Sequence, residues 1–283
     1  MPINNRVVEL SPGQEKQSST TKYYRLGQRA VASNGEAVFR YARAGAALLP
    51  SQLCQGRSTA TLSLGYTVAD TVAPTPDTAV ALGTRVIIMD SPSTHDTVDA
   101  DAFQDGIMSV ITGPGQGHAH RMRLNTAVGV DDATQMTVTL YEDDGIVDTP
   151  LSTVSQLSLY RNWYDGVVPV DIDTTSTPPL GVSPAEVVTD GYFWLQTWGP
   201  CPVRAELGTR MPTAGQGVIA AVTTSSFAGA VEQPAEYATA FDVVDTVNQS
   251  GWALPRVGYA IGLITGDTAA DDFSVMIFVT LAP

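Results

Sequence analysis

The feature that most constrains the fold is the regular spacing of turn signals along the chain. Clusters of Gly, Pro, Asn and Asp recur roughly every ten residues, and no run longer than about a dozen residues has apolar positions at helical period. Between the clusters, short segments such as 107–112 and 134–141 alternate apolar and polar side chains. The sequence therefore predicts an all-β fold built from β-barrel or β-sandwich modules of jelly-roll or β-tulip type.

The segment 190–202 is expected to form the central strand. Asp190-Gly191 and Gly199-Pro200 bound it, and four aromatic residues lie between these two turn signals. Even-numbered positions from 192 to 198 share one face of such a strand, and odd-numbered positions share the other. Both faces are bulky, so we expect layers on both sides and buried side chains for Trp194 and Trp198. An alternative is that Trp198 and the Gly-Pro-Cys-Pro exit contact a partner subunit.

The length and the proline pattern predict two β domains. The chain has 283 residues, and segment 171–184 carries three prolines and no periodicity, as a linker would. We therefore predict an extended N-terminal arm over 1–25, a first β domain over 26–170, the linker over 171–184, and a second β domain over 185–283.

The charge balance excludes one class of partner and favours another. With 15 basic and 29 acidic residues the net charge is −14, which disfavours sequence-independent binding to nucleic acid. Charged residues make up only 16% of the chain, so its surface is poor in solvated charge for a free monomer. This composition indicates a homo-oligomer that buries surface against other chains.

The first 25 residues differ from the rest of the chain in charge. They hold four basic and two acidic residues, a net charge of +2, with both lysines of the protein among them. We predict an arm that is disordered alone and orders on an acidic partner surface; the alternative is a frayed terminus without a role. The residues expected to contact a partner are Arg6, Lys16, Lys22, Tyr23, Tyr24, Arg25 and Trp198.

No motif in the sequence predicts catalysis, a cofactor or a metal. Cys54 and Cys201 form neither a disulfide framework nor a metal-binding pair, and we expect both to be reduced and buried. His118 and His120 share one strand face, but a third ligand would have to be a distant carboxylate. The turn at 113–117 lacks the Lys-Ser/Thr of a phosphate loop, and no calcium-loop or Gly-x-Ser-x-Gly pattern occurs. We therefore predict that the protein is not an enzyme.

The sequence also predicts no membrane partner. Its beginning has no apolar segment of the secretory type, and its most apolar tract, 273–281, is too short to span a bilayer as a helix. We expect synthesis and assembly in a cytoplasm.

Several longer phrases carry a resemblance to a known family. They are GEAVFRYARAGAALLPSQLCQG at 35–56, FQDGIMSVITGPGQGHAHRMRLNTA at 103–127, TVTLYEDD at 137–144, GYFWLQTWGPCPV at 191–203, and the closing VGYAIG and FVTL. In this order and spacing they resemble virion structural proteins of tailed phages. The ending is also similar to small head-decoration proteins, which cap three-fold positions of the capsid as trimers.

The resemblance implies a function that the residues alone do not. The chain would be a non-enzymatic capsid decoration, or cement, protein that binds the outer capsid surface and stabilises the head. Its partners would be the major capsid protein and itself, as a homotrimer, on the exterior of the virion. Alternatives are a tail or neck component, or a carbohydrate-binding β module, for which Trp163-Tyr164-Asp165-Gly166 is the one place for an aromatic cluster.

Overall fold

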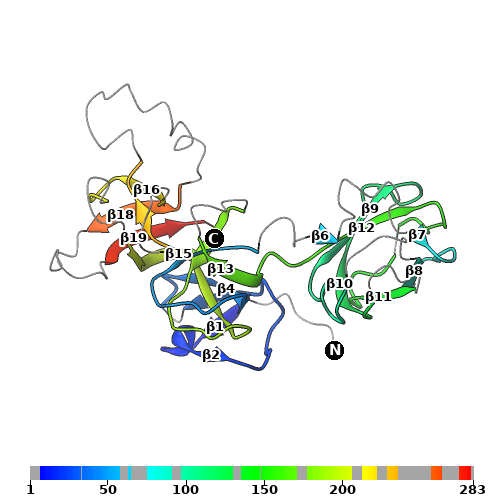
Figure 1. Ribbon diagram of the computed structural model, residues 1–283, viewed down its shortest axis with the longest axis horizontal. Coiled ribbons are helices and arrows are strands. Elements are labelled where there is room, and N and C mark those ends of the chain that lie inside the picture. Colours follow the sequence, from blue (N-terminus) through cyan, green and yellow to red (C-terminus); the bar gives the residue numbers. More distant parts are fainter. Residues whose placement is uncertain are drawn as a thin grey trace, which may run out of the picture. The chain divides into compact units, whose positions relative to one another are not determined.

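The regular secondary structure of the described residues is almost entirely β-strand, as predicted (Figure 1). The computed structural model describes residues 7–32, 34–57, 63–64, 75–90, 97–129, 135–146, 148–170, 177–205, 212–221, 228–234, 256–262 and 274–281. In this part of the chain the only helical element is one 3-10 turn, η1 (Gln14–Lys16).

The described residues divide into two compact units whose boundaries differ from the predicted ones. One unit lies within 59–163, and the other combines 5–58 with 164–283. We call them the inserted unit and the barrel unit. The predicted division into 26–170 and 185–283 fails because strands on both sides of the insertion pair with one another.

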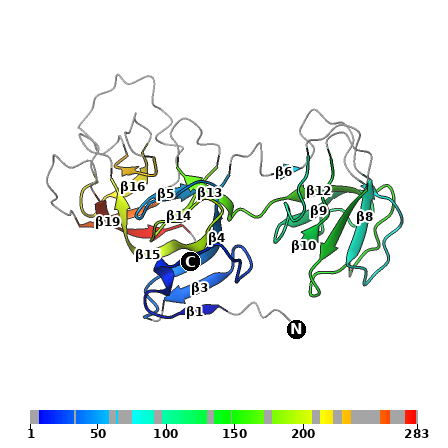
Figure 2. The same cartoon turned by 60° about the horizontal axis from the view of Figure 1, so that its bottom comes forward.

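Five strands of the barrel unit close into a ring (Figure 2). They are β4 (Val38–Ala44), β13 (Asp165–Pro169), β5 (Leu53–Gln55), β14 (Pro179–Val182) and β15 (Tyr192–Arg204). Each pairs with the next, and β15 pairs back with β4. The ring encloses small and apolar side chains, namely Ala42, Ala44, Leu48, Cys54, Val167, Val187, Phe193 and Leu195.

The predicted linker 171–184 contributes a strand to this ring. Residues 171–176 lie outside the described part, but Pro179–Val182 form β14 and pair with β5 and β15. Proline opens the strand, a position where the missing N–H costs no ladder hydrogen bond. Gly181 permits the close pairing, since a Cβ there would lie 2.6 Å from the carbonyl oxygen of Gln196. Proline content alone therefore gave the wrong assignment for 179–182.

Strand β15 continues past the ring into a second sheet layer. Its second half pairs with β19 (Ser274–Thr280), and the sheet continues through β18 (Gly258–Gly262), β16 (Gly217–Ala220) and β17 (Val231–Glu232). The apolar core of this part includes Cys201, Val203, Val218, Val231, Val275, Ile277 and Val279. The segment predicted as the central strand is thus shared by both parts of the unit.

The N-terminal segment packs on its own chain, so the prediction of a free arm is not confirmed. Strand β1 (Val8–Leu10) pairs in parallel with β3 (Arg29–Ala32), and β2 (Ser18–Ser19) pairs with β15. Strands β3 and β4 form the hairpin expected at Asn34-Gly35. These elements cover the outer face of β4 and β15 with a cluster of Leu10, Leu26, Ala30, Phe39, Tyr41 and Trp194. Burial of Leu10 and stacking of Tyr24 on Trp194 offset the cost of ordering the segment.

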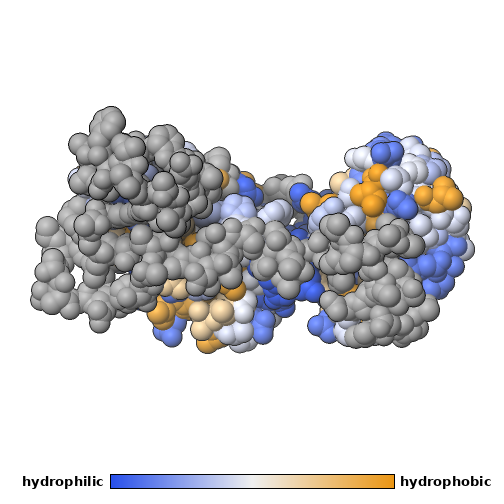
Figure 3. Space-filling view, turned by 45° about the horizontal axis from the view of Figure 1, so that its top comes forward, coloured by the Kyte–Doolittle hydropathy of each residue, from blue (hydrophilic) through white to orange (hydrophobic). Residues whose placement is uncertain are grey.

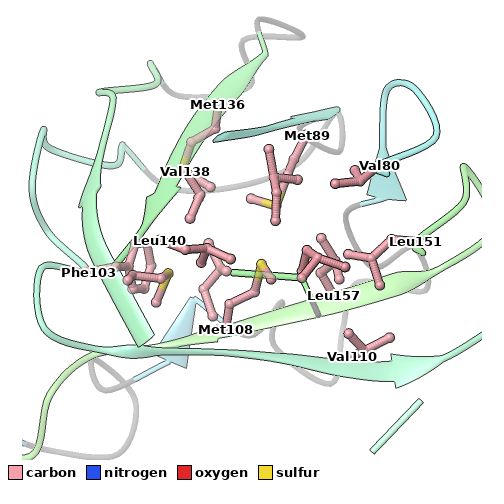
Figure 4. Packing of buried hydrophobic residues seen from close by; sticks show 14 of the residues in the cluster. Val80, Met89, Phe103, Met108, Val110, Met136, Val138, Leu140, Leu151 and Leu157 are labelled. Atoms are coloured by element: carbon pink, nitrogen blue, oxygen red, sulfur yellow. The ribbon is translucent and has the colours of Figure 1, made fainter. Parts of the chain in front are cut away.

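The inserted unit is one curled sheet of seven strands. Their order is β6 (Ser63–Leu64), β12 (Gln156–Tyr160), β9 (Ile107–Thr112), β10 (Ala119–Asn125), β11 (Met136–Leu140), β8 (Val86–Asp90) and β7 (Thr75–Pro76). A bridge between Val80 and Leu151 joins the two ends of the curl. Figure 4 shows Met89, Met108, Phe103, Leu140 and Leu157 pointing toward one another in its core.

Candidate partner-binding face

The candidate site begins where β15 leaves the ring. The pairing of β15 with β4 shifts by one residue between Gln196 and Trp198, so that Thr197 is buried and its hydroxyl donates to the Val38 carbonyl at 3.4 Å. The Gln196 side chain stabilises this bulge, since its Nε2 donates to the carbonyl oxygens of Trp198 and Pro200 at 3.2 and 2.9 Å. A bulge changes which residues of a strand point to the core. Trp198 therefore points away from the core that Trp194 occupies.

Gly199 makes the bulge sterically feasible. Its φ is +98°, and a Cβ at this position would lie 2.2 Å from the carbonyl oxygen of Glu36. That carbonyl belongs to the β3–β4 turn, which is held by hydrogen bonds between the Asn34 side chain and both the backbone N–H and the carboxylate of Glu36. A larger residue would separate the turn from β15, so the hairpin and the bulge fix the position of Trp198 together.

Beyond the bulge, alternate residues of three strands form one continuous face. Pro200 lies opposite Phe278 of β19, which lies opposite Tyr259 of β18. The Trp198 and Phe278 rings meet edge to face with centroids 5.3 Å apart. We call this surface the Trp198 face; its side chains are Trp198, Pro200, Pro202, Tyr259, Ile261, Met276 and Phe278.

The Trp198 face is accessible and uncharged. Tyr259 and Ile261 are 47% and 51% exposed, Pro200 and Pro202 are exposed, and Trp198, Met276 and Phe278 are half-buried. The prediction that Trp198 is buried is therefore wrong, whereas Trp194 is buried as expected. None of the seven residues carries a charge, in a protein whose net charge is −14; the next residue of β15 on this side, Arg204, is half-buried at the end of the face. Contiguous exposed apolar surface of this kind is typical of an interaction site.

The structure separates the residues that were predicted to contact a partner. Arg6 lies outside the described residues. Lys16 and Tyr23 are exposed, and the backbone N–H of Tyr23 donates to the Tyr41 hydroxyl at 3.1 Å. Lys22, Tyr24 and Arg25 are half-buried, and Tyr24 packs on Trp194 and Tyr41 in the cluster below β1 and β3. Trp198 belongs to a different face, with Phe278 as its ring partner.

Sequence reasoning identified Trp198 but missed the other members of its face. Tyr259, Met276 and Phe278 lie in segments that were predicted correctly as strands 256–265 and 273–281. Which of their faces is covered depends on the pairing of β19 with the far end of β15. The Gly-Pro-Cys-Pro sequence was the available signal, because proline in a strand is confined to an edge that is not paired in a ladder, and among the described strands this segment of β15 pairs only with β19.

The cysteine thiols are unsuited to nucleophilic chemistry. Cys54 and Cys201 are both free and buried, as predicted. Burial raises the pKa of each thiol to about 12, so almost no thiolate forms at neutral pH.

The histidine pair is placed as predicted but gathers no ligand set. The rings of His118 and His120 have centroids 6.4 Å apart, and His120 Nδ1 lies 3.7 Å from Asp144 Oδ1. Among the residues that the structure describes, no three His, Cys, Asp or Glu side chains are grouped to hold a metal.

The aromatic segment considered for sugar binding is split by burial. Trp163 is exposed, whereas Tyr164 packs against the apolar clusters of the barrel unit, and burial raises its pKa. Of these two aromatic residues, Trp163 alone is exposed, so the segment does not present the aromatic cluster that was considered for carbohydrate binding.

Comparisons of the chain with protein-family models, with curated proteins and with solved structures found no match. A search of the described residues for a helix long and apolar enough to cross a membrane also found none.

Proposed function

We propose that the chain is a non-enzymatic structural protein of a tailed-phage virion and acts as a capsid decoration protein. It binds the outer surface made by the major capsid protein and stabilises the head there. It works as a homotrimer and assembles in the host cytoplasm. The sequence phrases at 35–56, 103–127 and 191–203 support the family, through their resemblance to virion structural proteins.

The observation that carries the proposal is the Trp198 face. A decoration protein needs a preformed, rigid surface that can be covered by another protein, and this face is a paired three-strand sheet rather than a loop. Its members include Trp, Tyr, Phe and Met, the residue types enriched at protein interfaces. The absence of charge on the face lets it dock without leaving an acidic group unpaired and desolvated.

The acidic composition agrees with a position on the capsid exterior. A chain of net charge −14 is repelled by packaged nucleic acid, so an inward-facing position is unfavourable. The same charge keeps the free protein soluble before it binds.

The decisive experiment is binding to mature capsids purified without this protein. We expect the wild-type protein to saturate the capsid surface and, after gold labelling, to decorate heads rather than tails in negative-stain images. Ile261→Glu places a charge on the Trp198 face at an exposed position and should abolish decoration while leaving the fold intact. The control is Val154→Glu, an aliphatic residue of the inserted unit that is exposed even more than Ile261.

Three results would contradict the proposal. Labelling confined to tails would assign the protein to the tail or neck. Equal capsid binding by Ile261→Glu and wild type would exclude the Trp198 face as the attachment surface. A compact monomer in sedimentation that also leaves capsids bare would contradict the decoration role altogether.

A further inference from the structure

The outer side of the curled sheet in the inserted unit carries a second exposed surface, and this one is basic. Tyr160 of β12 lies opposite Ile107 of β9, which lies opposite Arg121 of β10. Arg123, two residues after Arg121 in β10, is also exposed. It lies at the register shift in the pairing of β10 with β11, between Met122 and Leu124. We call the group of Ile107, Arg121, Arg123 and Tyr160 the arginine face; Figure 3 shows apolar residues reaching the surface of this unit among hydrophilic ones.

Both guanidinium groups of the arginine face are available. Neither Arg121 nor Arg123 forms an ion pair with any residue that the structure describes. The carboxylate of Asp144 accepts from the backbone N–H of Arg121 at 2.6 Å, and its Oδ1 lies 3.7 Å from His120 Nδ1. The flanking Ile107 and Tyr160 side chains are each 42% exposed. Exposed arginines beside an exposed aliphatic side chain and an exposed aromatic ring suit a protein partner whose own surface is acidic and partly apolar.

The barrel unit presents a surface of that chemistry at the turn between β14 and β15. Val188 is 59% exposed, and the exposed carboxylates of Glu186 and Asp190 lie two residues to either side of it. Neither carboxylate forms an ion pair with a described residue. We call Glu186, Val188 and Asp190 the acidic turn.

The acidic turn is held rigidly. Val187 forms a bridge to Leu48, and the backbone N–H of Asp190 donates to the Ala44 carbonyl at 2.9 Å. Asp190 itself adopts a left-handed conformation with φ of +62°. A turn fixed in this way loses little conformational entropy when it docks.

We propose that the arginine face binds the acidic turn of a second copy of this chain. The two surfaces match in kind, since each combines exposed apolar side chains with two charges of opposite sign to those of the other. The partner can be a second copy of the chain, because every copy carries both surfaces. Such contacts are head-to-tail, so they close into a ring when the rotation between copies permits. The inference deepens the proposed function by assigning surfaces to its self-association, and its test requires no capsid.

Charge reversal on each side, followed by mixing, tests the proposal by sedimentation at micromolar concentration. We expect wild-type protein to associate at low salt, and more weakly at about 0.5 M salt, where exposed charges are screened. Arg121→Glu/Arg123→Glu and Glu186→Lys/Asp190→Asn should each weaken self-association by on the order of tenfold. Asn is chosen at position 190 because it tolerates the left-handed conformation. An equimolar mixture of the two variants should associate again, because each basic surface then meets an acidic one.

The control variant Lys16→Glu/Arg85→Glu changes the net charge by the same amount as Arg121→Glu/Arg123→Glu, at exposed positions outside both surfaces. It should associate like wild type. All variants should melt close to the wild-type temperature, since the one ion pair removed among the described residues, between Arg85 and Glu142 at 3.8 Å, is exposed and contributes little stability. Wild-type protein that stays monomeric at every salt concentration would overturn the proposal, as would charge-reversed variants that associate like wild type. Failure of the mixture to associate would also overturn it. Capsid binding by Ile261→Glu is measured separately, so failure of one proposal does not imply failure of the other.

Discussion

The two units of the chain build their cores in different ways. The inserted unit is continuous in sequence, and one cluster that includes four of the chain's seven methionines fills its curled sheet. The barrel unit is assembled from both sides of the insertion, and its three clusters are organised along the single strand β15. Methionine adapts to an irregular cavity. The barrel unit instead encloses alanine, valine and leucine side chains with Phe193 inside a closed ring, and packs Phe39, Tyr41 and Trp194 on its outer face. One unit thus folds through local contacts and the other through contacts that span the insertion.

The insertion leaves and re-enters the barrel unit at neighbouring strands, which explains why it is tolerated. Val168 of β13 lies opposite Gln55 of β5. The chain therefore leaves the ring after β5 and returns to it through the adjacent strand, β13. The return point is fixed by Asp165, whose carboxylate accepts from Arg43 Nε at 2.6 Å. Burial lowers the pKa of Arg43, but the Asp165 charge and hydrogen bond outweigh it and raise the pKa overall. An insertion between close, anchored ends adds little closure cost to the host fold.

The strongest test of this contrast is a matched pair of core truncations. Phe103 and Phe193 are both fully buried, one in each unit. Each change to Ala should remove about 3–5 kcal/mol of stability, but only from its own unit. Calorimetry of the wild type should show two unfolding transitions; Phe103→Ala should lower the temperature of one and Phe193→Ala that of the other. A single transition that both variants shift equally would show that the units fold as one.

A second test concerns the close approach on which the barrel unit alone depends. Gly199→Ala meets both an unfavourable φ and the Glu36 carbonyl, so we expect a loss of about 3 kcal/mol or more in the barrel unit. Gly215→Ala is the control, because its φ is also positive at +84° but no atom lies within 4 Å of the added Cβ. It should cost only about 1–2 kcal/mol of backbone strain. Equal losses from the two changes would show that the contact with the hairpin turn is unimportant.

Alkaline pH should destabilise the barrel unit selectively. Both cysteines lie in it, and their folded pKa of about 12 exceeds the ordinary value of 9.0. Above pH 9 the unfolded chain loses these protons while the folded chain keeps them, so stability falls as pH rises toward 12. At pH 10 the loss is about 1.4 kcal/mol for each thiol. The buried hydroxyls of Tyr41 and Tyr164, whose pKa values burial raises, act in the same direction.

Thermal melts at pH 8 and pH 10 measure this effect. Between pH 8 and pH 10 the melting temperature of the barrel unit should fall by more than that of the inserted unit. In the Cys201→Ala variant the fall for the barrel unit should be smaller. Rapid alkylation of either thiol in the folded protein at pH 8 would contradict the burial on which the prediction depends.

The strands were largely predictable from sequence, but their grouping into units was not. Segments 107–112 and 134–141 have strict alternation and clear turn signals, and they became β9 and β11. The short strands β5 and β14 have three and four residues, too few for a period to be visible. Pairing between β5 and β14 crosses the insertion, and no local pattern encodes which distant strands meet. The segment 238–247, also expected to be a strand, lies outside the described residues.

The candidate site was predictable only where a local sequence signal marked it. Trp198 beside alternating prolines indicated an unusual strand exit, and the bulge at Thr197 explains it. The alternation of side chains between the two faces of β15, followed from Tyr192 to Gln196, does not continue through that bulge. Period alone therefore placed the Trp198 side chain on the wrong face. The basic N-terminal residues were predicted to contact a partner because they lie in a polar segment. Leu10 and Tyr24, however, pack that segment against the barrel unit.

The last comparison separates the two tryptophans of β15 by the stability that each contributes. Trp194 is 3% exposed and packs against Tyr24 and Tyr41, so Trp194→Ala should cost about 3–5 kcal/mol. Trp198 is half-buried, and its ring partner is Phe278, so Trp198→Ala should cost only about 1–2 kcal/mol. Urea unfolding of the two variants gives the comparison directly.

In capsid binding, measured at a temperature where both variants are folded, the order of the two effects should reverse. Trp198→Ala should bind far more weakly than wild type, while Trp194→Ala should bind like wild type. A loss of stability as large for Trp198 as for Trp194 would mean that Trp198 serves the core, and the Trp198 face would then lose its central member.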